Sequence, residues 1–158
     1  YFVGQGQQMV KLDLNHKFIA KAKSKLVNKT NSVDEVVIVN LIQFLKPAER
    51  INFVNELWRV MKKGAKCQIV APHWCASRAW GDLAFEFPPV AEPWFSHLNK
   101  EWRAKNAPWG TRYKCDFDHT YGYGMHPLLI NRNQEYQHDA LQFHKEAAQD
   151  LIATLIKR

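Results

Sequence analysis

A strand–helix–strand pattern between residues 33 and 72 constrains the fold of this chain more than any other feature. Residues 36–39 are a continuous apolar, β-branched run, which favours a strand buried on both faces of a sheet. Pro47 suits the first turn of a helix, and apolar residues then recur at three- and four-residue steps. Gly64 is expected to end this helix in the left-handed conformation, and a second apolar strand follows as far as Pro72. Two apolar strands joined by a helix predict a parallel sheet in an α/β fold with a right-handed crossover.

The rest of the chain alternates between shorter helical and extended patterns. We expect a strand at 8–14, a basic helix at 17–29, a helix from Pro93 to about Lys105, a strand at 113–123, a largely helical region at 128–148 and a last strand at 150–156. Residues 73–91, rich in proline, tryptophan and glycine, are expected to form an ordered loop over the upper edge of the sheet.

The composition is that of one folded domain without a disulfide framework. The 158 residues can bury a core of ordinary size, and six tryptophans argue against a disordered chain. Cys67, Cys75 and Cys115 are odd in number and scattered, so we expect reduced thiols. No apolar run is long enough to span a bilayer, and we expect a cytoplasmic protein or a component of a virus particle. The formal charge of +7 favours a polyanionic partner, although many basic proteins bind none.

Seven short phrases spread through the chain form an ordered set. They are Asn31-Ser32-Val33-Asp34-Glu35, Asn55 to Gly64 with its Lys-Lys-Gly end, Ala71-Pro72-His73-Trp74, Arg78 to Asp82, Asn99 to Arg103, Asn133 to Gln137 and Gln149 to Leu155. In this order they resemble the second half of class I S-adenosylmethionine (SAM)-dependent methyltransferases, in a subgroup common in environmental bacteria and their viruses (phages).

The resemblance implies a single methyltransferase-like domain over residues 1–158. Residues 1–32 would be a divergent basic segment, and residues 33–158 would be the carboxy-terminal portion of the fold. The implied fold is α/β, Rossmann-like and doubly wound, with a mostly parallel sheet and an antiparallel final strand. The sheet would be truncated at its amino-terminal side.

In that family the cofactor and the substrate meet at the carboxyl ends of the strands. The resemblance implies a cofactor-binding role for Asn40, Leu41 and Gln43, and a substrate pocket at Pro72, His73 and Trp74. Relatives tend to read His-x-x-Glu-His-Leu where residues 40–45 here read Asn-Leu-Ile-Gln-Phe-Leu. Three ionisable groups are thereby neutral, which removes proton-transfer and charge-stabilising options from the pocket. No catalytic residue is identified.

The family's two other cofactor-binding features, a glycine-rich turn and an acidic residue, have no clear counterpart. Gly4-Gln5-Gly6-Gln7 is followed by no helical pattern, which makes it a poor substitute for the turn. Tyr1-Phe2-Val3 reads as a remnant of the family's second strand, with Gln5 or Gly6 where the acid belongs. The expected cofactor is therefore SAM if the domain is active, and none if the site is lost. An upstream segment with a glycine-rich turn would restore the enzyme.

Other side chains give weaker hypotheses. Metal-capable groups are present at His73, Cys75, Cys115 and His119. Their spacing matches no zinc pattern, so we expect no metal. Asp116 and Asp118 could form an acid pair, although a solvated strand face is the simpler expectation. Six aromatic residues between 74 and 109 could cage a substrate or a base, but a hydrophobic lid packed on the sheet is favoured.

Basic residues of the amino-terminal segment could bind a polyanion. They are Lys17, Lys21, Lys23, Lys25 and Lys29. A merely solvated helix face explains them equally well.

Two functions of different classes therefore remain. One is a SAM-dependent methyltransferase. The other is a pseudoenzyme: a non-catalytic, basic structural or binding subunit of a nucleoprotein or viral assembly, with nucleic acid or the larger assembly as its partner. An incomplete sheet would expose an edge, and another copy of the chain could cover it as a homo-oligomer. No membrane partner is expected.

Overall fold

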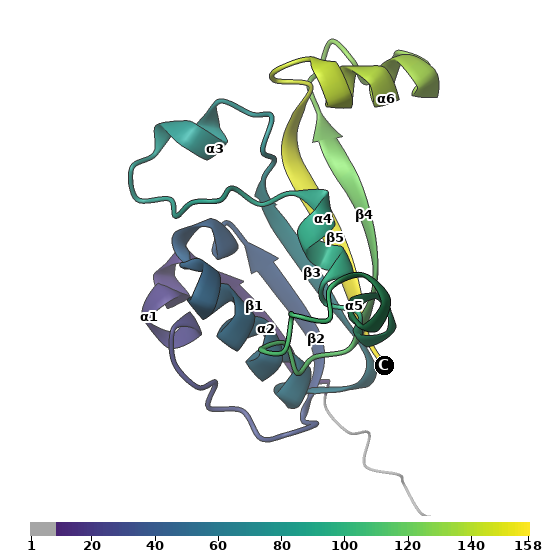
Figure 1. Ribbon diagram of the computed structural model, residues 1–158. Coiled ribbons are helices and arrows are strands. Elements are labelled where there is room, and N and C mark those ends of the chain that lie inside the picture. The colour runs from purple at the N-terminus through teal and green to yellow at the C-terminus, as the bar shows by residue number, and fades with distance from the viewer. Residues whose placement is uncertain (1–8) are drawn as a thin grey trace, which may run out of the picture.

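The computed structural model describes residues 9–158, which form a five-stranded mixed sheet with the strand order β1-β2-β3-β5-β4 (Figure 1). The strands are β1 (Lys11–Asn15), β2 (Val33–Val39), β3 (Met61–Pro72), β4 (Phe117–Met125) and β5 (Ala148–Lys157). The helices are α1 (Ile19–Ala22), α2 (Pro47–Val60), α3 (Arg78–Gly81), α4 (Glu92–Ser96), α5 (Lys100–Asn106) and α6 (Gln134–Phe143). Two 3₁₀ turns, η1 (His16–Phe18) and η2 (Ile42–Phe44), follow β1 and β2. The expectations for Tyr1-Phe2-Val3 and Gly4-Gln5-Gly6-Gln7 lie outside the described residues.

The strand directions confirm the expected fold class. β1, β2 and β3 are parallel neighbours, and β5 runs antiparallel to both β3 and β4. Ile38 of β2 lies beside Ile69 of β3, and Ile69 lies beside Ala153 of β5. The central strand–helix–strand unit is therefore a parallel crossover, and only the last strand opposes the common direction. This is a Rossmann-like α/β sheet with an antiparallel final strand.

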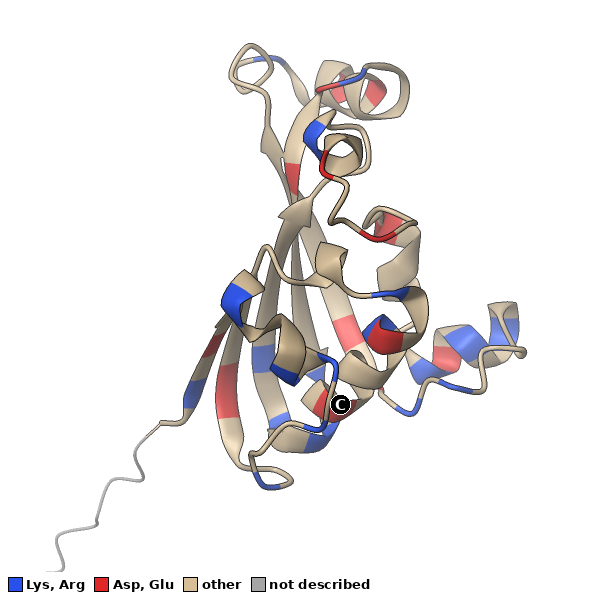
Figure 2. Ribbon diagram, turned by 90° about the vertical axis from the view of Figure 1, so that its left-hand side faces the viewer, with Lys and Arg blue, Asp and Glu red and all other residues tan. Residues whose placement is uncertain are grey.

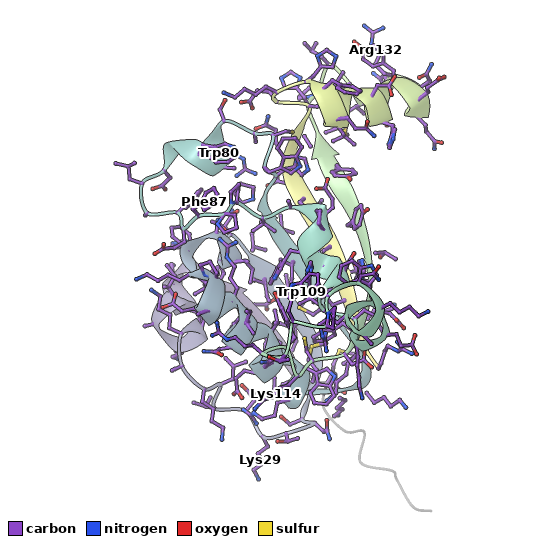
Figure 3. All side chains as sticks on the ribbon, viewed as in Figure 1. Lys29, Trp80, Phe87, Trp109, Lys114 and Arg132 are labelled. Carbon is purple, nitrogen blue, oxygen red and sulfur yellow. The ribbon has the colours of Figure 1, made fainter. Side chains whose placement is uncertain are left out.

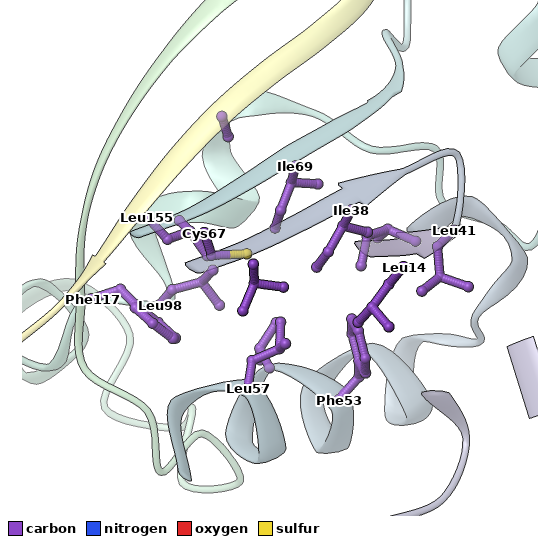
Figure 4. Packing of buried hydrophobic residues seen from close by; sticks show 14 of the residues in the cluster. Leu14, Ile38, Leu41, Phe53, Leu57, Cys67, Ile69, Leu98, Phe117 and Leu155 are labelled. Atoms are coloured by element: carbon purple, nitrogen blue, oxygen red, sulfur yellow. The ribbon is translucent and has the colours of Figure 1, made fainter. Parts of the chain in front are cut away.

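The main hydrophobic core lies between one face of the sheet and the helices. Figure 4 shows Phe53 and Leu57 of α2 packed toward Ile38 and Ile69 of the central strands. In Figure 2 the strands lie at the left, and the helices of the main body lie to their right. Val39, on the opposite face, is 38% exposed. The expectation that residues 36–39 are buried on both faces is wrong for the described part of the chain, because its helices pack on one face only.

A second, smaller hydrophobic cluster holds α6 against the upper ends of β4 and β5, away from the main core (Figure 1). Its buried members are Cys75, Ala140, Ala147 and Ala148. Partly buried Tyr123 and Leu141 pack against them. Three of the four buried members are alanines, so this cluster removes much less apolar surface from water than the main core does.

The end of α2 differs from the sequence expectation. The helix begins at Pro47, as expected, and Glu49 accepts a hydrogen bond from the backbone N–H of Lys46 at 2.8 Å. It ends at Val60 rather than at Gly64, because Met61 already pairs with Val33 in the sheet. Gly64 does adopt the left-handed conformation, with φ +78°, but inside β3, where the register between β2 and β3 shifts. Sheet pairing overrides helix continuation here.

The basic helix expected at 17–29 is short, and α1 ends at Ala22. An ion pair on α2 holds the following segment in a loop conformation. Glu56 accepts the backbone N–H of Leu26 at 3.0 Å, and Arg59 donates to the carbonyl of Leu26 at 2.8 Å. Backbone groups bonded to these side chains are not available to continue a helix.

Two further helical expectations are too long. The helix expected at Pro93 to Lys105 is divided into α4 and α5, because Asn99 caps a new helix by accepting the N–H of Trp102 at 2.9 Å. The region expected at 128–148 contains only α6, which begins after Asn133 accepts the N–H of Tyr136 at 2.8 Å. The strand expected at 113–123 is β4, and it starts later, at Phe117.

The cysteines, the edge of the sheet and the helix lengths bear on the remaining expectations. Cys67, Cys75 and Cys115 are free and buried, as expected of reduced thiols. The outer edge of β1 pairs with no other strand within residues 9–158. None of the helices in this range is both long and apolar enough to cross a membrane. A homo-oligomer stays a prediction.

Candidate functional site

A network of three polar side chains lies at the carboxyl end of β3. His73 directly follows β3 and is fully buried, and its Nε2 lies 2.8 Å from Oε1 of Glu92 at the start of α4. The hydroxyl of Tyr123, on β4, donates to the same Glu92 oxygen at 2.9 Å. Three elements that are distant in the sequence therefore meet on one carboxylate oxygen.

The other side of the His73 ring contacts Cys75. Nδ1 of His73 lies 2.9 Å from Sγ of Cys75, and the backbone N–H of Cys75 donates to the same nitrogen at 3.4 Å. Nδ1 is therefore an acceptor, which places the ring proton on Nε2, where it is donated to Glu92. Cys75 is 5% exposed, and its sulfur also contacts the backbone N–H and carbonyl of Ala148 at 3.4 Å each.

The network fixes the charge of Glu92. Burial alone would raise the pKa of Glu92. The hydrogen bond from His73, the backbone N–H of Glu92 itself and the electrostatic attraction of His73, with a smaller contribution from Tyr123, outweigh burial and lower that pKa to about 2. Burial and the neighbouring Glu92 carboxylate raise the pKa of Tyr123 well above its usual range. At neutral pH the site thus contains a carboxylate and a neutral phenol. A carboxylate with so low a pKa is a poor general base, so its role is electrostatic.

An open pocket of about 490 Å³ lies beside this network, and we call it the β3–β4 pocket. Its lining residues are Trp74, Ala91, Glu92, Pro93, Tyr121, Tyr123, His138, Leu141 and Gln142. They come from the end of β3, the start of α4, the middle of β4 and α6. Ligands of α/β sheets bind outside the carboxyl ends of the strands, and this pocket has that position.

Only part of this site is predictable from the sequence. Trp74 lines the pocket, and His73 lies behind its wall as the partner of Glu92. Pro72 instead pairs with Asp150 of β5 within the sheet. Glu92 and Tyr123 were missed as site residues. Glu92 precedes a proline and reads locally as an ordinary helix start, and the only sequence signal for Tyr123 is the alternation of its strand.

The residues with an expected cofactor-binding role lie at the carboxyl end of β2. Asn40 is half-buried, with a left-handed φ of 51°, and its N–H donates to the carbonyl of Val70 at 2.9 Å. Leu41 is fully buried, and Gln43 is 4% exposed. Oε1 of Gln43 has no hydrogen-bond partner within residues 9–158.

The loop that follows β3 covers Gln43. The backbone N–H of Glu86 donates to the carbonyl of Gln43 at 2.7 Å. Phe85 packs edge-on against Phe44, with the ring centroids 4.9 Å apart. This part of the loop forms the expected cover over the edge of the sheet.

The turn after β1 lacks the glycine that would let its backbone approach the adenosyl part of SAM closely. The turn after β1 is the 3₁₀ turn His16–Phe18, and Asn15 caps it by accepting the N–H of Lys17 at 3.0 Å. Close backbone approach to a nucleoside needs glycine, and this turn contains none. The free acceptor oxygen of Gln43 suits a donor group, but it does not replace a turn that clasps adenosine.

A groove of about 760 Å³ runs between the loop after α1, helix α2 and the segment before β4; we call it the α2 groove. Lys23, Lys25, Arg112 and Lys114 line it. Asn55 fixes its far wall, since its side chain accepts the N–H of Lys114 at 2.8 Å and donates to the carbonyl of Arg112 at 2.9 Å. The structure thus brings two of the expected polyanion-binding lysines together with Arg112, Lys114 and a third cation, Arg59, which is paired with Glu56 in the same lining.

The other three lysines of that set do not line this groove. Lys21 lies over the ring of Phe18, 5.4 Å from its centroid. Lys17 is at the 3₁₀ turn after β1, and Lys29 is exposed in the loop before β2 (Figure 3).

The remaining candidates do not form sites. Asp116 and Asp118 lie 3.9 and 3.8 Å from the guanidinium of Arg158, so they form ion pairs rather than an acid pair. Within residues 9–158 no three histidine, cysteine or acidic side chains are placed to hold a metal. The aromatic residues form no single lid. Trp80 and Phe87 project from the loop after β3, whereas Trp109 lies apart from them, in the lower, main body of the molecule (Figure 3).

Comparison with known proteins identifies the fold as that of SAM-dependent methyltransferases. A SAM-dependent methyltransferase from Archaeoglobus fulgidus matches with a TM-score of 0.57 and 16% identity, over 88% of this chain and 64% of that chain. A Thermotoga maritima SAM-dependent methyltransferase, a possible histamine N-methyltransferase, matches with a TM-score of 0.44 and 13% identity, over 87% of this chain and 61% of that chain. The chain therefore spans less than two thirds of the length of each. No protein-family model and no curated protein sequence matches it.

The class I methyltransferase-like fold expected from the sequence phrases is thus confirmed. The narrower bacterial and viral subgroup stays a prediction. At 16% identity the likeness to the Archaeoglobus protein establishes the fold alone.

Proposed function

We propose that this chain forms the acceptor-binding part of a SAM-dependent methyltransferase domain. One observation carries the proposal. The His73–Glu92–Tyr123 network adjoins an open pocket at the carboxyl edge of a Rossmann-like sheet, where such sheets bind their ligands. The fold shared with SAM-dependent methyltransferases supports the same function.

SAM supplies an electrophilic methyl group in such enzymes, and the work of the protein is mainly to position the acceptor. In this chain the β3–β4 pocket would bind the acceptor, and Glu92 would hold its charge. Asn40 and Gln43, at the next strand end, would face the cofactor. The adenosyl part of SAM would need binding residues outside 9–158.

The proposal predicts weak cofactor binding and slow methyl transfer by residues 1–158. Isothermal titration should give a dissociation constant for SAM of about 1 mM or weaker, because the turn after β1 has no glycine. A micromolar constant would show that the chain clasps the cofactor after all. Radiolabelled SAM at millimolar concentration, incubated with a small-molecule cell extract, should still give a labelled product above the protein-free background.

The extract should be separated by ion exchange into cationic, neutral and anionic fractions, so that the class of any acceptor is read directly. A His73→Ala variant, which loses the partner of Glu92, is the matched protein control. A complete absence of labelled product in all three fractions would contradict the methyltransferase proposal.

A second candidate function, polyanion binding, has its own supporting observation. Lys25, Arg112 and Lys114 in the α2 groove have no carboxylate partner within 4.0 Å among residues 9–158, whereas Lys23 lies 3.5 Å from Glu49. Unpaired cations along one groove are the arrangement that tracks a phosphate backbone. This would suit the non-catalytic binding subunit.

Charge reversal in the α2 groove is expected to weaken binding to single-stranded DNA. An Arg112→Glu/Lys114→Glu double variant should lose about tenfold in affinity or more at low salt, and its salt dependence should fall by one to two counterions. Fluorescence anisotropy at several salt concentrations measures both. Arg132→Glu/Lys145→Glu, which reverses two exposed cations beside α6, is the matched control. Equal losses in the two double variants would remove the α2 groove as the binding site.

A further inference from the structure

The β3–β4 pocket combines one carboxylate with aromatic walls. Glu92 is the only acidic side chain in its lining, and no lysine or arginine lines it among the described residues. The side chain of Glu92 is 19% exposed, and the hydrogen bonds that His73 and Tyr123 donate to it both fall on Oε1. Oε2 accepts no hydrogen bond from another residue within residues 9–158, which leaves it available to a ligand.

No lysine or arginine within residues 9–158 lies within 4.0 Å of the Glu92 carboxylate, which contacts only His73 and Tyr123. His73 donates from Nε2 while its Nδ1 accepts from the Cys75 backbone, and Tyr123 donates a phenolic proton. Arg78, the first residue of α3, is paired with Asp150. His138, which lines the pocket, has its Nε2 2.8 Å from the side chain of Gln142. An isolated, partly buried carboxylate is stabilised by a ligand of opposite charge.

The aromatic walls favour a particular kind of cation. Trp74 is 38% exposed and Tyr121 is 47% exposed, so both rings are available to a ligand. Tyr121 and Tyr123 lie edge to face, with centroids 6.0 Å apart. The faces of Trp and Tyr rings attract cations, and they pack well against alkylated ammonium groups, which are weakly hydrated.

We propose that the β3–β4 pocket binds a small organic ammonium ion, with its charge at Glu92 and its alkyl groups against Trp74 and Tyr121. The pocket volume of about 490 Å³ suits a molecule of metabolite size. This names the substrate class of the proposed methyltransferase and so rests on that function, but the binding itself can be measured without cofactor.

The test is an NMR titration of the chain with choline, followed at the Trp74 indole resonance. Choline should bind with a dissociation constant of about 1 mM or tighter. The neutral isostere, a dimethylbutanol in which carbon replaces nitrogen, should bind at least about tenfold more weakly. Equal binding of choline and its neutral isostere would show that the carboxylate charge does not hold the ligand, and it would overturn the proposal.

Two sets of variants separate the charge from the aromatic wall. Glu92→Gln should reduce choline binding at least about tenfold and leave isostere binding unchanged. Tyr121→Leu should weaken choline binding, whereas Tyr121→Phe, which retains the ring face, should not. Tyr121 is exposed, and its hydroxyl has no hydrogen-bond partner within residues 9–158, so the two Tyr121 variants are informative even if the Glu92 variant folds poorly. Equal choline binding by both Tyr121 variants would also overturn the proposal.

The two proposals fail in distinguishable ways. Choline binding without any labelled methyl product would keep the ammonium pocket and remove the methyltransferase function. Labelled product confined to neutral or anionic acceptors, with no choline binding, would do the reverse.

Discussion

An Arg50→Met variant is expected to lose about 3–5 kcal/mol of unfolding free energy. Arg50 is 5% exposed, and its guanidinium donates to four backbone carbonyls. Nε bonds Ile42 at 3.2 Å and Leu45 at 2.9 Å. Nη1 bonds Pro88 at 2.6 Å, and Nη2 bonds Glu86 at 3.0 Å. One side chain thus ties α2 to the turn after β2 and to the loop that covers Gln43.

Methionine fills a similar volume but leaves these carbonyls without a donor in a buried place, and that desolvation cost is the main loss. Lysine keeps the charge, yet a single ammonium cannot reproduce the planar fork, so Arg50→Lys should also lose about 2 kcal/mol. Burial lowers the pKa of Arg50, but a guanidinium remains charged at neutral pH.

Urea unfolding measures the free energies, and limited proteolysis between residues 82 and 90 reports release of the loop. Arg132→Met, at an exposed arginine beside α6, is the matched control and should change stability by less than about 0.5 kcal/mol. If the unfolding free energy of Arg50→Met lies within about 1 kcal/mol of that of the parent chain, and the loop stays protected from protease, then the four hydrogen bonds of Arg50 do not stabilise the fold.

The second large effect is expected in acid. The folded-state pKa of Glu92 is about 2, below the ordinary value of 4.5, so its ionised form stabilises the fold. That stabilisation is complete above about pH 4.5 and is lost as the pH falls towards 2. After allowance for partial solvent exposure, it amounts to about 2 kcal/mol.

Urea unfolding at a series of pH values should therefore show that the parent chain and Glu92→Gln differ at pH 7 and converge near pH 2. Glu135→Gln, which removes an exposed carboxylate from the first turn of α6, is the matched control. A constant difference between the parent chain and Glu92→Gln at all pH values would mean that packing, rather than ionisation, sets the cost of the substitution.

The sequence predicts those features that depend on neighbours along the chain. The β-branched run of β2, the start of α2 at Pro47 and the two parallel strands follow from local periodicity and capping. The exact ends do not, because contacts from elsewhere decide them. Met61 joins the sheet beside Val33, and Glu56 holds the backbone near Leu26 out of a helix.

The candidate site likewise contains residues that the local sequence predicts and residues that only distant contacts place. His73 and Trp74 follow a strand end, and a strand end at the carboxyl edge of an α/β sheet is predictable as a ligand position. Glu92 reaches His73 only because the loop after β3 returns across the sheet, and Tyr123 arrives from a strand formed much later. No spacing in the sequence predicts that His73 and Tyr123 contact Glu92. The same holds for Arg112 and Lys114, which Asn55 brings to the α2 groove.

The small alanine-rich cluster under α6 has a dynamic consequence. α6 provides one wall of the β3–β4 pocket, whereas another wall comes from the start of α4, a helix that buries Phe95 in the larger core. A helix held by so little apolar contact opens more often than the sheet beneath it, and its amides should exchange with solvent sooner than those of α2. A ligand that contacts both walls would slow amide hydrogen exchange in α6 and leave exchange in α2 unchanged. Ligand binding in the pocket could therefore be detected as increased protection of α6 alone.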